Sequence, residues 1–211
     1  MKKYIVEFIG TFFLVLVIGN VVINPPATGS EETIQLTTAI RNVTPPLAIG
    51  TVLIAVIFGG GHVSAAHYNP AVTLAALLRG SCAVRDVVPY IAMQIAAAAT
   101  AGFTVIFLKG PEVMETVVAL KLDNVPQVLV AEILGTFLLV WVILNVATAK
   151  GTEGNSFYGV AIGFTVTAMI YAFGSISGAV FNPAVAVGIC MMGLASWNKI
   201  WIYLAANFVG G

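Results

Sequence analysis

The sequence predicts an all-α membrane protein, a single domain with six transmembrane helices and two re-entrant half-helices. Three observations predict it: the composition, the length of the apolar segments, and two motifs that each occur twice. Of the 211 residues, 59% are hydrophobic and only 9% are charged. Soluble globular chains carry about 25% charged residues, so lipid is the solvent that fits this composition.

Charge and cysteine content exclude several function classes. Nine basic residues balance nine acidic ones, and no basic patch indicates a nucleic-acid partner. Cys82 and Cys190 lie in apolar surroundings without metal or redox spacing. We therefore expect two buried thiols in preference to a disulfide or a nucleophile, and we expect no metal and no cofactor.

The first apolar run, after Lys2 and Lys3, could be a signal peptide or a retained membrane helix. It is longer than the core of a signal peptide, Glu7 interrupts it, and no A-x-A cleavage site follows. We therefore expect a retained first membrane helix.

Six segments approach the length of roughly 20 residues that crosses a bilayer core of about 30 Å. The expected spans are Ile5–Ile23, Pro46–Gly61, Val87–Leu108, Val128–Ala149, Phe157–Phe173 and a last one that begins near Trp197. Polar connections separate several of them, the longest at residues 24–44. The last span reaches Gly211 after only about 15 residues, which is short for a crossing. Either the chain is cut short or this helix is shorter than usual, and we favour the first.

Two pairs of motifs indicate an internal repeat. "EFIGTFFLVLVIGN" (7–20) superposes on "EILGTFLLVWVILN" (132–145), and "GHVSAAHYNPAV" (61–72) superposes on "GSISGAVFNPAV" (174–185). The second offset also relates Tyr90 to Tyr203 and Gln94 to Asn207. We therefore expect one domain over residues 1–211, with repeat 1 at 1–109 and repeat 2 at 128–211.

Three spans per repeat make the repeat an inverted one, because the second copy enters the membrane from the opposite side. Basic residues weakly favour a cytoplasmic N-terminus, which would place five of them inside and four outside. The inner set is Lys2, Lys3, Arg79, Arg85 and Lys150, and the outer set is Arg41, Lys109, Lys121 and Lys199.

An Asn-Pro-Ala triplet interrupts an apolar stretch in each repeat. The triplets are Asn69, Pro70 and Ala71, and Asn182, Pro183 and Ala184. Asn is a favoured N-cap, and proline fits the first helical position because its missing N–H has no partner there. A helix of about ten residues follows each triplet, which at 1.5 Å per residue reaches half-way across the core. The Gly-, Ser- and Ala-rich segments before the triplets suit extended chain that lines a cavity.

Two inverted half-helices would meet near the membrane midplane with their N-termini together. Their dipoles place partial positive charge there, and both Asn amides can donate hydrogen bonds, which orients water and repels cations and protons. Backbone carbonyls would form a ladder of acceptors along this pore, at Ala65, Ala66, His67, Gly178, Ala179 and Val180. A single Asn-Pro would more simply begin a loop, as Asn24-Pro25 does, but two copies in register favour a pore.

These residues resemble the aquaporin family, also called major intrinsic proteins, over essentially the whole chain. The resemblance rests on residues 7–11 and 132–136, on "HVSAAHYNPAVT", on "DVVPYIAMQ" (86–94) and on the second "FNPA". It implies the aquaporin-like right-handed bundle, one pore per protomer, a homotetramer and a multi-pass protein of the plasma (inner) membrane.

The resemblance also implies roles for polar residues within the spans. Glu7 and Glu132 match family glutamates that hold the re-entrant loops by accepting backbone N–H bonds, and for Glu7 the alternative is a side chain that extends to the membrane surface. Gln94 and Asn207 are expected to hold helices together. His62 matches a histidine at the cytoplasmic mouth of the family's pore. It would either line or gate this opening, or it would have only a structural role in packing.

The sequence departs from the family at the outer constriction. Most members carry an arginine where this chain has Val185, and by spacing the other three positions are Ile49, Ile170 and Ala179. A ring of four apolar residues is either wide enough for water and larger neutral solutes, or narrow and dewetted, passing ammonia, carbon dioxide or other gases better than water. A third possibility is that Arg41 supplies the missing cation.

We therefore expect a passive channel for water and small uncharged solutes, not an enzyme. The alternative within this class is a facilitator for glycerol-like solutes, ammonia or gases with poor water flux. A coupled secondary transporter is the alternative from another class, but it needs ionisable residues at the midplane, and only Glu7 and Glu132 lie within spans. No Ser–His, HExxH or paired-Asp arrangement indicates catalysis.

Overall fold

The computed structural model describes residues 1–211 as a bundle of helices without strands, which confirms the predicted fold class. The helices are α1 (Lys2–Val22), α2 (Glu31–Ser64), α3 (Pro70–Leu78), α4 (Val84–Met114), α5 (Val125–Thr148), α6 (Tyr158–Ser177), α7 (Pro183–Met191) and α8 (Ile200–Gly210), with 3₁₀ turns at Lys150–Thr152 and Trp197–Lys199. By length and composition, five can cross a membrane: α1, α2, α4, α5 and α6. The helix α8 has 11 residues, fewer than a crossing needs.

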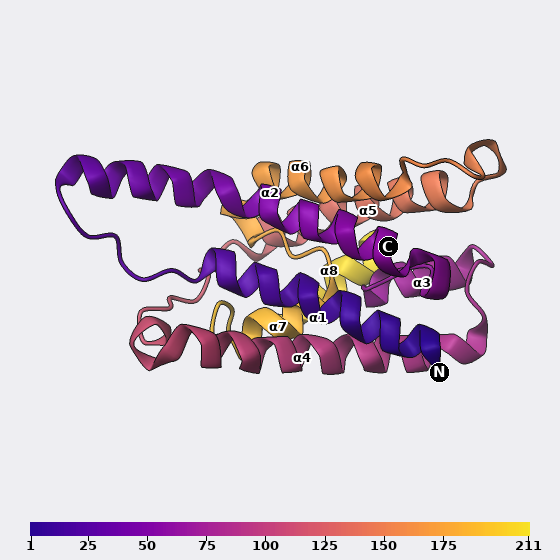
Figure 1. The fold of residues 1–211 in the computed structure, drawn as a ribbon, viewed down its shortest axis with the longest axis horizontal. Coiled ribbons are helices and arrows are strands. Elements are labelled where there is room, and N and C mark those ends of the chain that lie inside the picture. Colours follow the sequence, from indigo (N-terminus) through magenta and orange to yellow (C-terminus); the bar gives the residue numbers. More distant parts are fainter.

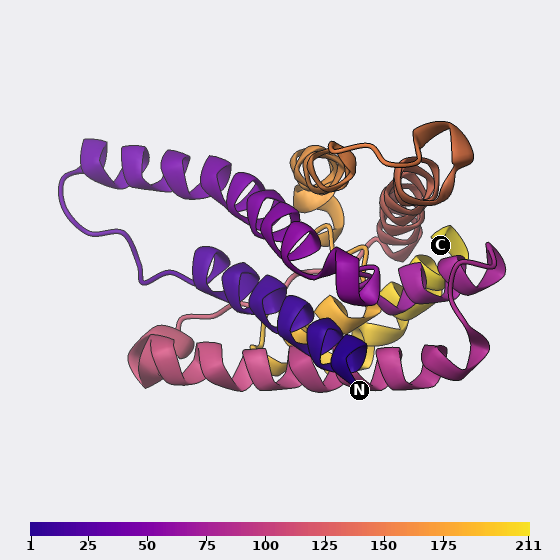
Figure 2. The ribbon, with the colours of Figure 1, turned by 45° about the vertical axis from the view of Figure 1, so that its right-hand side comes forward.

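The helices follow the same order in both halves of the chain. In the first half α1 packs against α2 and α4, and in the second half α5 packs against α6 and α8 (Figures 1 and 2). Contacts between α2 and α6, and between α4 and α7, join the halves. The short helices α3 and α7 contact each other inside this frame.

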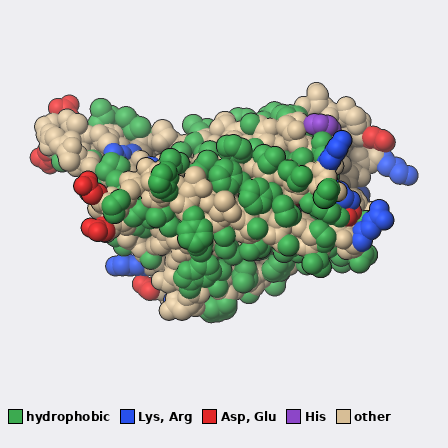
Figure 3. Space-filling model, turned by 60° about the horizontal axis from the view of Figure 1, so that its bottom comes forward, with side chains coloured by type: hydrophobic (Ala, Val, Ile, Leu, Met, Phe, Trp, Pro, Cys, Tyr) green, Lys and Arg blue, Asp and Glu red, His purple; other side chains and the backbone are tan.

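Charged and apolar side chains divide the surface as a membrane requires. The face in Figure 3 is covered by apolar side chains over its middle, and its charged side chains gather at the two ends of the long axis. Large apolar side chains such as Phe103, Phe107 and Trp141 are exposed on the protein surface. An apolar surface of this extent needs a lipid environment, so the chain is an integral, multi-pass membrane protein.

We call the end that holds Met1 the N-terminal end and the opposite end, where α2 begins, the far end (Figure 1). The helix α2 begins much earlier than Pro46, where the sequence predicted the span to start. Ser30 caps it by accepting a hydrogen bond from the Thr33 N–H, and Glu31 and Glu32 lie in its first turn. The cap and the two acids beside the positive end of the helix dipole stabilise this start.

Pro45 and Pro46 therefore lie inside α2 instead of beginning it. Neither can donate to the carbonyl four residues earlier, so the carbonyls of Arg41 and Asn42 lose their helical partners. The predicted polar connection is thus limited to residues 23–30, and the rest of it is helical.

The segments before the two half-helices are also more helical than predicted. Extended chain was expected over residues 60–68 and 174–180, but α2 continues through Ser64 and α6 through Ser177. Each helix ends where a residue adopts left-handed φ, at Ala65 (φ 66°) and at Gly178 (φ 83°). Gly, Ser and Ala residues do not by themselves end a helix. Each helix ends here because one residue adopts a left-handed backbone conformation. Between each long helix and the asparagine that follows it, only residues 65–68 and 178–181 are irregular, and we call them the first and second re-entrant loops.

Each re-entrant loop packs an aromatic side chain against a glycine of a long helix. A Cβ at Gly10 would overlap the Tyr68 ring, and one at Gly135 would overlap the Phe181 ring. Both aromatic residues are buried. The glycines are therefore required for close approach of helix and loop.

Replacing Gly135 with alanine is expected to lower the free energy of unfolding by about 1–3 kcal/mol, because the Phe181 ring must move out of a packed site. Gly59→Ala is the matched control, since Gly59 also lies inside a helix but has open space where a Cβ would extend. The helix propensity of alanine favours both variants equally. Thermal unfolding in detergent should give a lower midpoint for Gly135→Ala, and equal midpoints would contradict the assignment.

Candidate functional site

A cavity of about 1430 Å³ runs inside the bundle and is lined by residues from both of its ends. Asn24 and Arg41 line it at the far end, and His62 and Asn155 line it at the N-terminal end. Asn69 and Asn182 line the same cavity. The cavity thus connects the two charged ends past the start of both half-helices.

The half-helices begin at the two asparagines, as the triplets predicted. Asn69 caps α3 by accepting a hydrogen bond from the Ala71 N–H at 2.9 Å, with Pro70 at the first helical position. Asn182 caps α7 by accepting from the N–H groups of Ala184 at 2.9 Å and Val185 at 3.4 Å.

The two asparagines also tie the halves of the molecule together. The Asn69 Nδ2 donates to the Phe181 carbonyl at 2.9 Å, and the Asn182 Nδ2 donates to the Tyr68 carbonyl at 2.9 Å. A side-chain amide has two N–H groups. One N–H of each asparagine is therefore bonded to the opposite loop, and this bond fixes the orientation of the side chain. The second N–H is available to donate a hydrogen bond to a molecule in the cavity.

The two re-entrant loops share an unusual backbone. Ala65, Ala66 and Tyr68 in the first loop, and Ala179 and Phe181 in the second, have left-handed φ values between 49° and 66°. Such conformations cost on the order of 1–3 kcal/mol each for residues other than glycine. Groups that bond to both loops must therefore offset this strain.

Glu7 accepts hydrogen bonds from the first loop and its surroundings with both oxygens of a fully buried carboxylate. Its Oε1 accepts from the Ser64 hydroxyl at 2.7 Å and the His67 N–H at 3.0 Å. Its Oε2 accepts from the Tyr68 N–H at 2.7 Å and the Gln94 Nε2 at 2.8 Å. The carboxylate thus lies in the interior, away from the membrane surface.

Glu132 has the equivalent partners in the second loop. Its Oε1 accepts from the Ser177 hydroxyl at 2.6 Å and the Val180 N–H at 2.9 Å. Its Oε2 accepts from the Phe181 N–H at 2.8 Å and the Asn207 Nδ2 at 2.8 Å. Glu7 and Glu132, which occupy corresponding positions in the two sequence motifs, thus have the same kinds of hydrogen-bond partners.

The carbonyls before each asparagine have no partner within the protein. No backbone or side-chain donor of the chain bonds to any of the six, although each of these residues lines the cavity. They are those of Ala65, Ala66, His67, Gly178, Ala179 and Val180. His67, Ala179 and Val180 are buried, whereas Ala65, Ala66 and Gly178 are at least partly exposed. Carbonyls without a protein partner need another donor, and molecules in the cavity can supply it.

The four expected constriction residues all line the same cavity. Ile49, Ala179 and Val185 are buried, and Ile170 is partly exposed. None carries a polar side-chain atom. Arg41 also reaches the cavity, at its far mouth, where its guanidinium donates to the Pro25 carbonyl at 2.6 Å.

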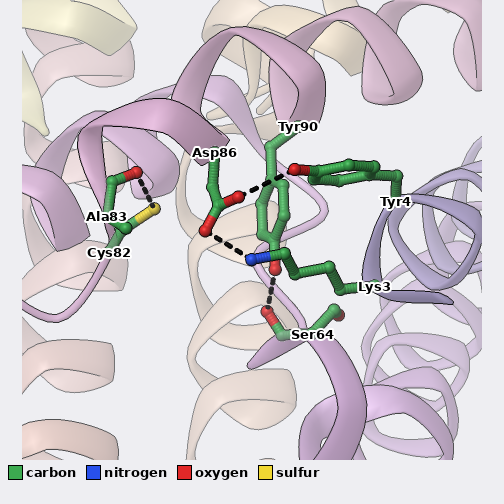
Figure 4. A network of polar contacts seen from close by, with 7 residues as sticks. All are labelled: Lys3, Tyr4, Ser64, Cys82, Ala83, Asp86 and Tyr90. Carbon is green, nitrogen blue, oxygen red and sulfur yellow. Dashed lines mark hydrogen bonds and ion pairs between the residues drawn. The ribbon is translucent and has the colours of Figure 1, made fainter. Parts of the chain in front are cut away.

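A smaller polar cavity of about 250 Å³ adjoins the N-terminal end of the large one, and His62 lines both. Beside it, Lys3 forms an ion pair with Asp86, and the Tyr4 hydroxyl donates to the same carboxylate at 2.8 Å (Figure 4). These bonds join the start of α1 to the start of α4. His62 thus lies at a mouth whose position is fixed by several polar contacts.

Some residues of the site have roles that the sequence did not indicate. The Tyr90 hydroxyl donates to the Ser64 carbonyl at 2.8 Å (Figure 4), and the Tyr203 hydroxyl donates to the Ser177 carbonyl at 2.7 Å. The shared offset that relates these residues was the available signal. Cys82 is a correction: we expected a buried thiol, but it is partly exposed because it lies in the loop between α3 and α4.

Comparison with known proteins agrees with this geometry. The family model of the major intrinsic proteins matches residues 1–211. The chain is 33% identical over 213 residues to aquaporin NIP1-1 of Zea mays, covering 100% of this chain and 71% of that protein. It is 33% identical over 234 residues to aquaporin AqpM of Methanothermobacter thermautotrophicus, covering 99% of this chain and 92% of that protein.

The fold is similar to that of a solved aquaglyceroporin from Plasmodium falciparum. The TM-score is 0.77 at 20% identity, covering 99% of this chain and 91% of that one. With the paired half-helices and the cavity that passes them, these matches establish that the chain belongs to the major intrinsic protein family, whose members are membrane channels and not enzymes.

Proposed function

We propose that the protein is a passive channel for water and small uncharged solutes. The carrying observation is the large cavity, in which six unpartnered carbonyls lead to the two asparagine amides. These groups can replace the hydrogen bonds that a neutral polar molecule loses when it leaves water. They cannot replace the hydration of an ion, whose transfer costs far more. The aquaporin relatives support the same assignment.

We propose further that Ile49, Ile170, Ala179 and Val185 form an apolar constriction that is wide rather than sealed. The position of all four residues on the wall of one continuous cavity supports the wide alternative. With no arginine among the four, selection rests on the carbonyls and asparagines. Such a pore would pass glycerol-sized neutral solutes together with water. The narrow alternative would favour ammonia and gases over water, and the absence of polar atoms from the ring supports it.

The remaining assignments follow from the family and from charge. We place the N-terminus in the cytoplasm and the protein in the plasma membrane, because the N-terminal end carries five of the nine basic residues. We treat 1–109 and 128–211 as the two repeats, Glu7 and Glu132 as supports of the re-entrant loops, and the assembly as a homotetramer. His62 lies at the inner mouth in this orientation.

Proteoliposome swelling measured by stopped flow tests the proposal, with water, glycerol, urea and ammonia compared side by side. We expect water and glycerol to enter faster than in empty vesicles, with no effect of an imposed proton or sodium gradient. Ile170→Trp is the control, because a larger side chain on the cavity wall should slow glycerol more than water. Ammonia flux without water flux would favour the narrow alternative, and coupling to a gradient would contradict a channel.

A further inference from the structure

The wall of the large cavity carries little charge for its size. Apart from two histidines, the only ionisable side chains of the charged residue types that line it are those of Arg41, Lys150 and Glu153. Lys150 and Glu153 lie in the connection between α5 and α6, at the N-terminal end of the bundle (Figure 1). Arg41 is therefore the one charged residue on the far half of the wall.

Arg41 has no counter-ion. Its side chain is half-buried, and its hydrogen bond within the protein goes to a neutral group, the Pro25 carbonyl. The ion pair of the structure joins Lys3 and Asp86 at the other end. A guanidinium stays charged at any physiological pH. Acidic residues also lie at or near the far end, but none of them lines the cavity or pairs with Arg41: Glu31, Glu32, Glu112, Glu115 and Asp123.

The position of Arg41 along α2 places it outside the constriction. Arg41, Pro45, Ile49, Leu53 and Ile57 follow one another at intervals of four residues, and all five line the cavity. Arg41 precedes Ile49 by two such intervals, which is about 12 Å along the helix at 1.5 Å per residue. A solute that enters from the far end therefore passes Arg41 before it reaches Ile49.

We propose that Arg41 makes the far mouth of the cavity electropositive and so selects against hydrated cations before they reach the constriction. This inference rests on the proposed function as a channel for uncharged solutes. Where a cleft is lined by one sign of charge, its low-dielectric wall focuses the field into the cleft. The field lowers the local concentration of cations and leaves that of neutral solutes unchanged. Val185 carries no charge, so the constriction itself cannot make this distinction.

Ser175 is a suitable place to measure the potential at this mouth. It lines the same cavity and is exposed. The Thr167 hydroxyl of α6 donates to the Pro46 carbonyl at 3.2 Å. One turn later, the Tyr171 hydroxyl donates to the Val43 carbonyl at 2.6 Å. The two helices thus run in opposite directions, and Ser175, one further turn along α6, lies level with the turn of α2 that carries the guanidinium.

The rates at which charged thiol reagents modify this position test the proposal. Ser175→Cys is made in a Cys82→Ser background, which removes the partly exposed natural thiol. The chain with Cys82→Ser alone is the blank, because its remaining thiol, Cys190, is buried. The detergent-solubilised protein reacts with an anionic sulfonate or a cationic trimethylammonium methanethiosulfonate, and mass spectrometry follows each rate relative to that of a small free thiol.

We expect the anionic reagent to be favoured over the cationic one by about fivefold at low salt, because the guanidinium attracts the first and repels the second. Arg41→Gln should abolish this preference, and Arg41→Lys, which keeps the charge, should retain part of it. Lys109→Gln is the matched control, because Lys109 is a cation of the same end that does not line the cavity. It should retain most of the preference.

Three results would overturn the proposal: an equal preference with and without Arg41, its complete loss in Arg41→Lys, or the same loss in Lys109→Gln as in Arg41→Gln. Water permeability of each variant in proteoliposomes confirms that the chain has folded. The reagents measure the potential at Ser175 whether or not solutes cross the constriction. Failure of the charge selection is therefore distinguishable from failure of the proposed channel, which the swelling of vesicles with the unchanged chain measures.

Discussion

Replacing Glu132 with alanine is expected to abolish folding of the second re-entrant loop and, with it, the channel. The change leaves four buried donors without an acceptor: the Ser177 hydroxyl, the N–H groups of Val180 and Phe181, and the Asn207 amide. Each buried group left unpaired costs about 1–3 kcal/mol. Their sum is comparable with the whole stability of a typical domain, about 5–15 kcal/mol.

The measurement is the yield of monodisperse protein in detergent together with its thermal unfolding midpoint. Glu112→Ala removes an exposed carboxylate at the far end and should behave as the unchanged chain does. Glu132→Gln keeps the shape and one acceptor oxygen, so we expect an intermediate loss. If Glu132→Ala unfolds at the same temperature as Glu112→Ala, the carboxylate does not support the loop.

Introducing arginine at Val185 is expected to lower proton conductance on the order of tenfold and to slow glycerol, while water still passes. Val185 lines the cavity and follows the second triplet directly, so a guanidinium there would lie beside the pore. At an effective dielectric constant of 20, two unit charges 4 Å apart repel by about 4 kcal/mol. Screening by water in the cavity reduces this, and about 1.4 kcal/mol suffices for a tenfold change.

Val185→Met separates charge from size, because methionine extends the side chain without adding a cation. It should slow glycerol and leave proton conductance unchanged. Proton flux is followed with a pH-sensitive dye inside proteoliposomes under an imposed gradient. Equal proton conductance in the unchanged chain and in Val185→Arg would mean that the half-helices alone exclude protons.

The sequence was sufficient for features that local patterns determine. The ends of α1 and α5 lie within a few residues of their predicted positions because apolar length sets both. Asn69 and Asn182 were identified as caps because the Asn-Pro pair has one favourable place in a helix. The partners of Glu7 and Glu132 were expected from the family resemblance, in agreement with the rule that a carboxylate inside a span needs a partner.

Features that depend on distant contacts were not predictable. The helix α2 begins at the Ser30 cap, within a polar segment. The spans were predicted from apolar length, which does not detect a helix that begins outside the apolar residues. The donors that Ser64 and Ser177 supply to the glutamates are set by packing of residues 57 and 45 positions apart. Their spacing from the two motifs was enough to predict that Ile49 and Ile170 belong to the same constriction. The distance between them across the cavity could not be predicted, because it depends on how α2 and α6 pack.

The exchange of hydrogen bonds between the asparagines and the opposite re-entrant loops constrains the order in which the molecule is made. The ribosome releases Asn69 more than a hundred residues before Phe181, the residue whose carbonyl it needs. Until the second half enters the bilayer, the first re-entrant loop therefore has Glu7 as its anchor but no partner for its asparagine. Insertion of the last third of the chain thus completes a half-built pore. A nascent chain stopped before Phe181 would hold its first loop by Glu7 and by local bonds such as that of the Tyr68 hydroxyl to the Val56 carbonyl, without the contact between the two halves.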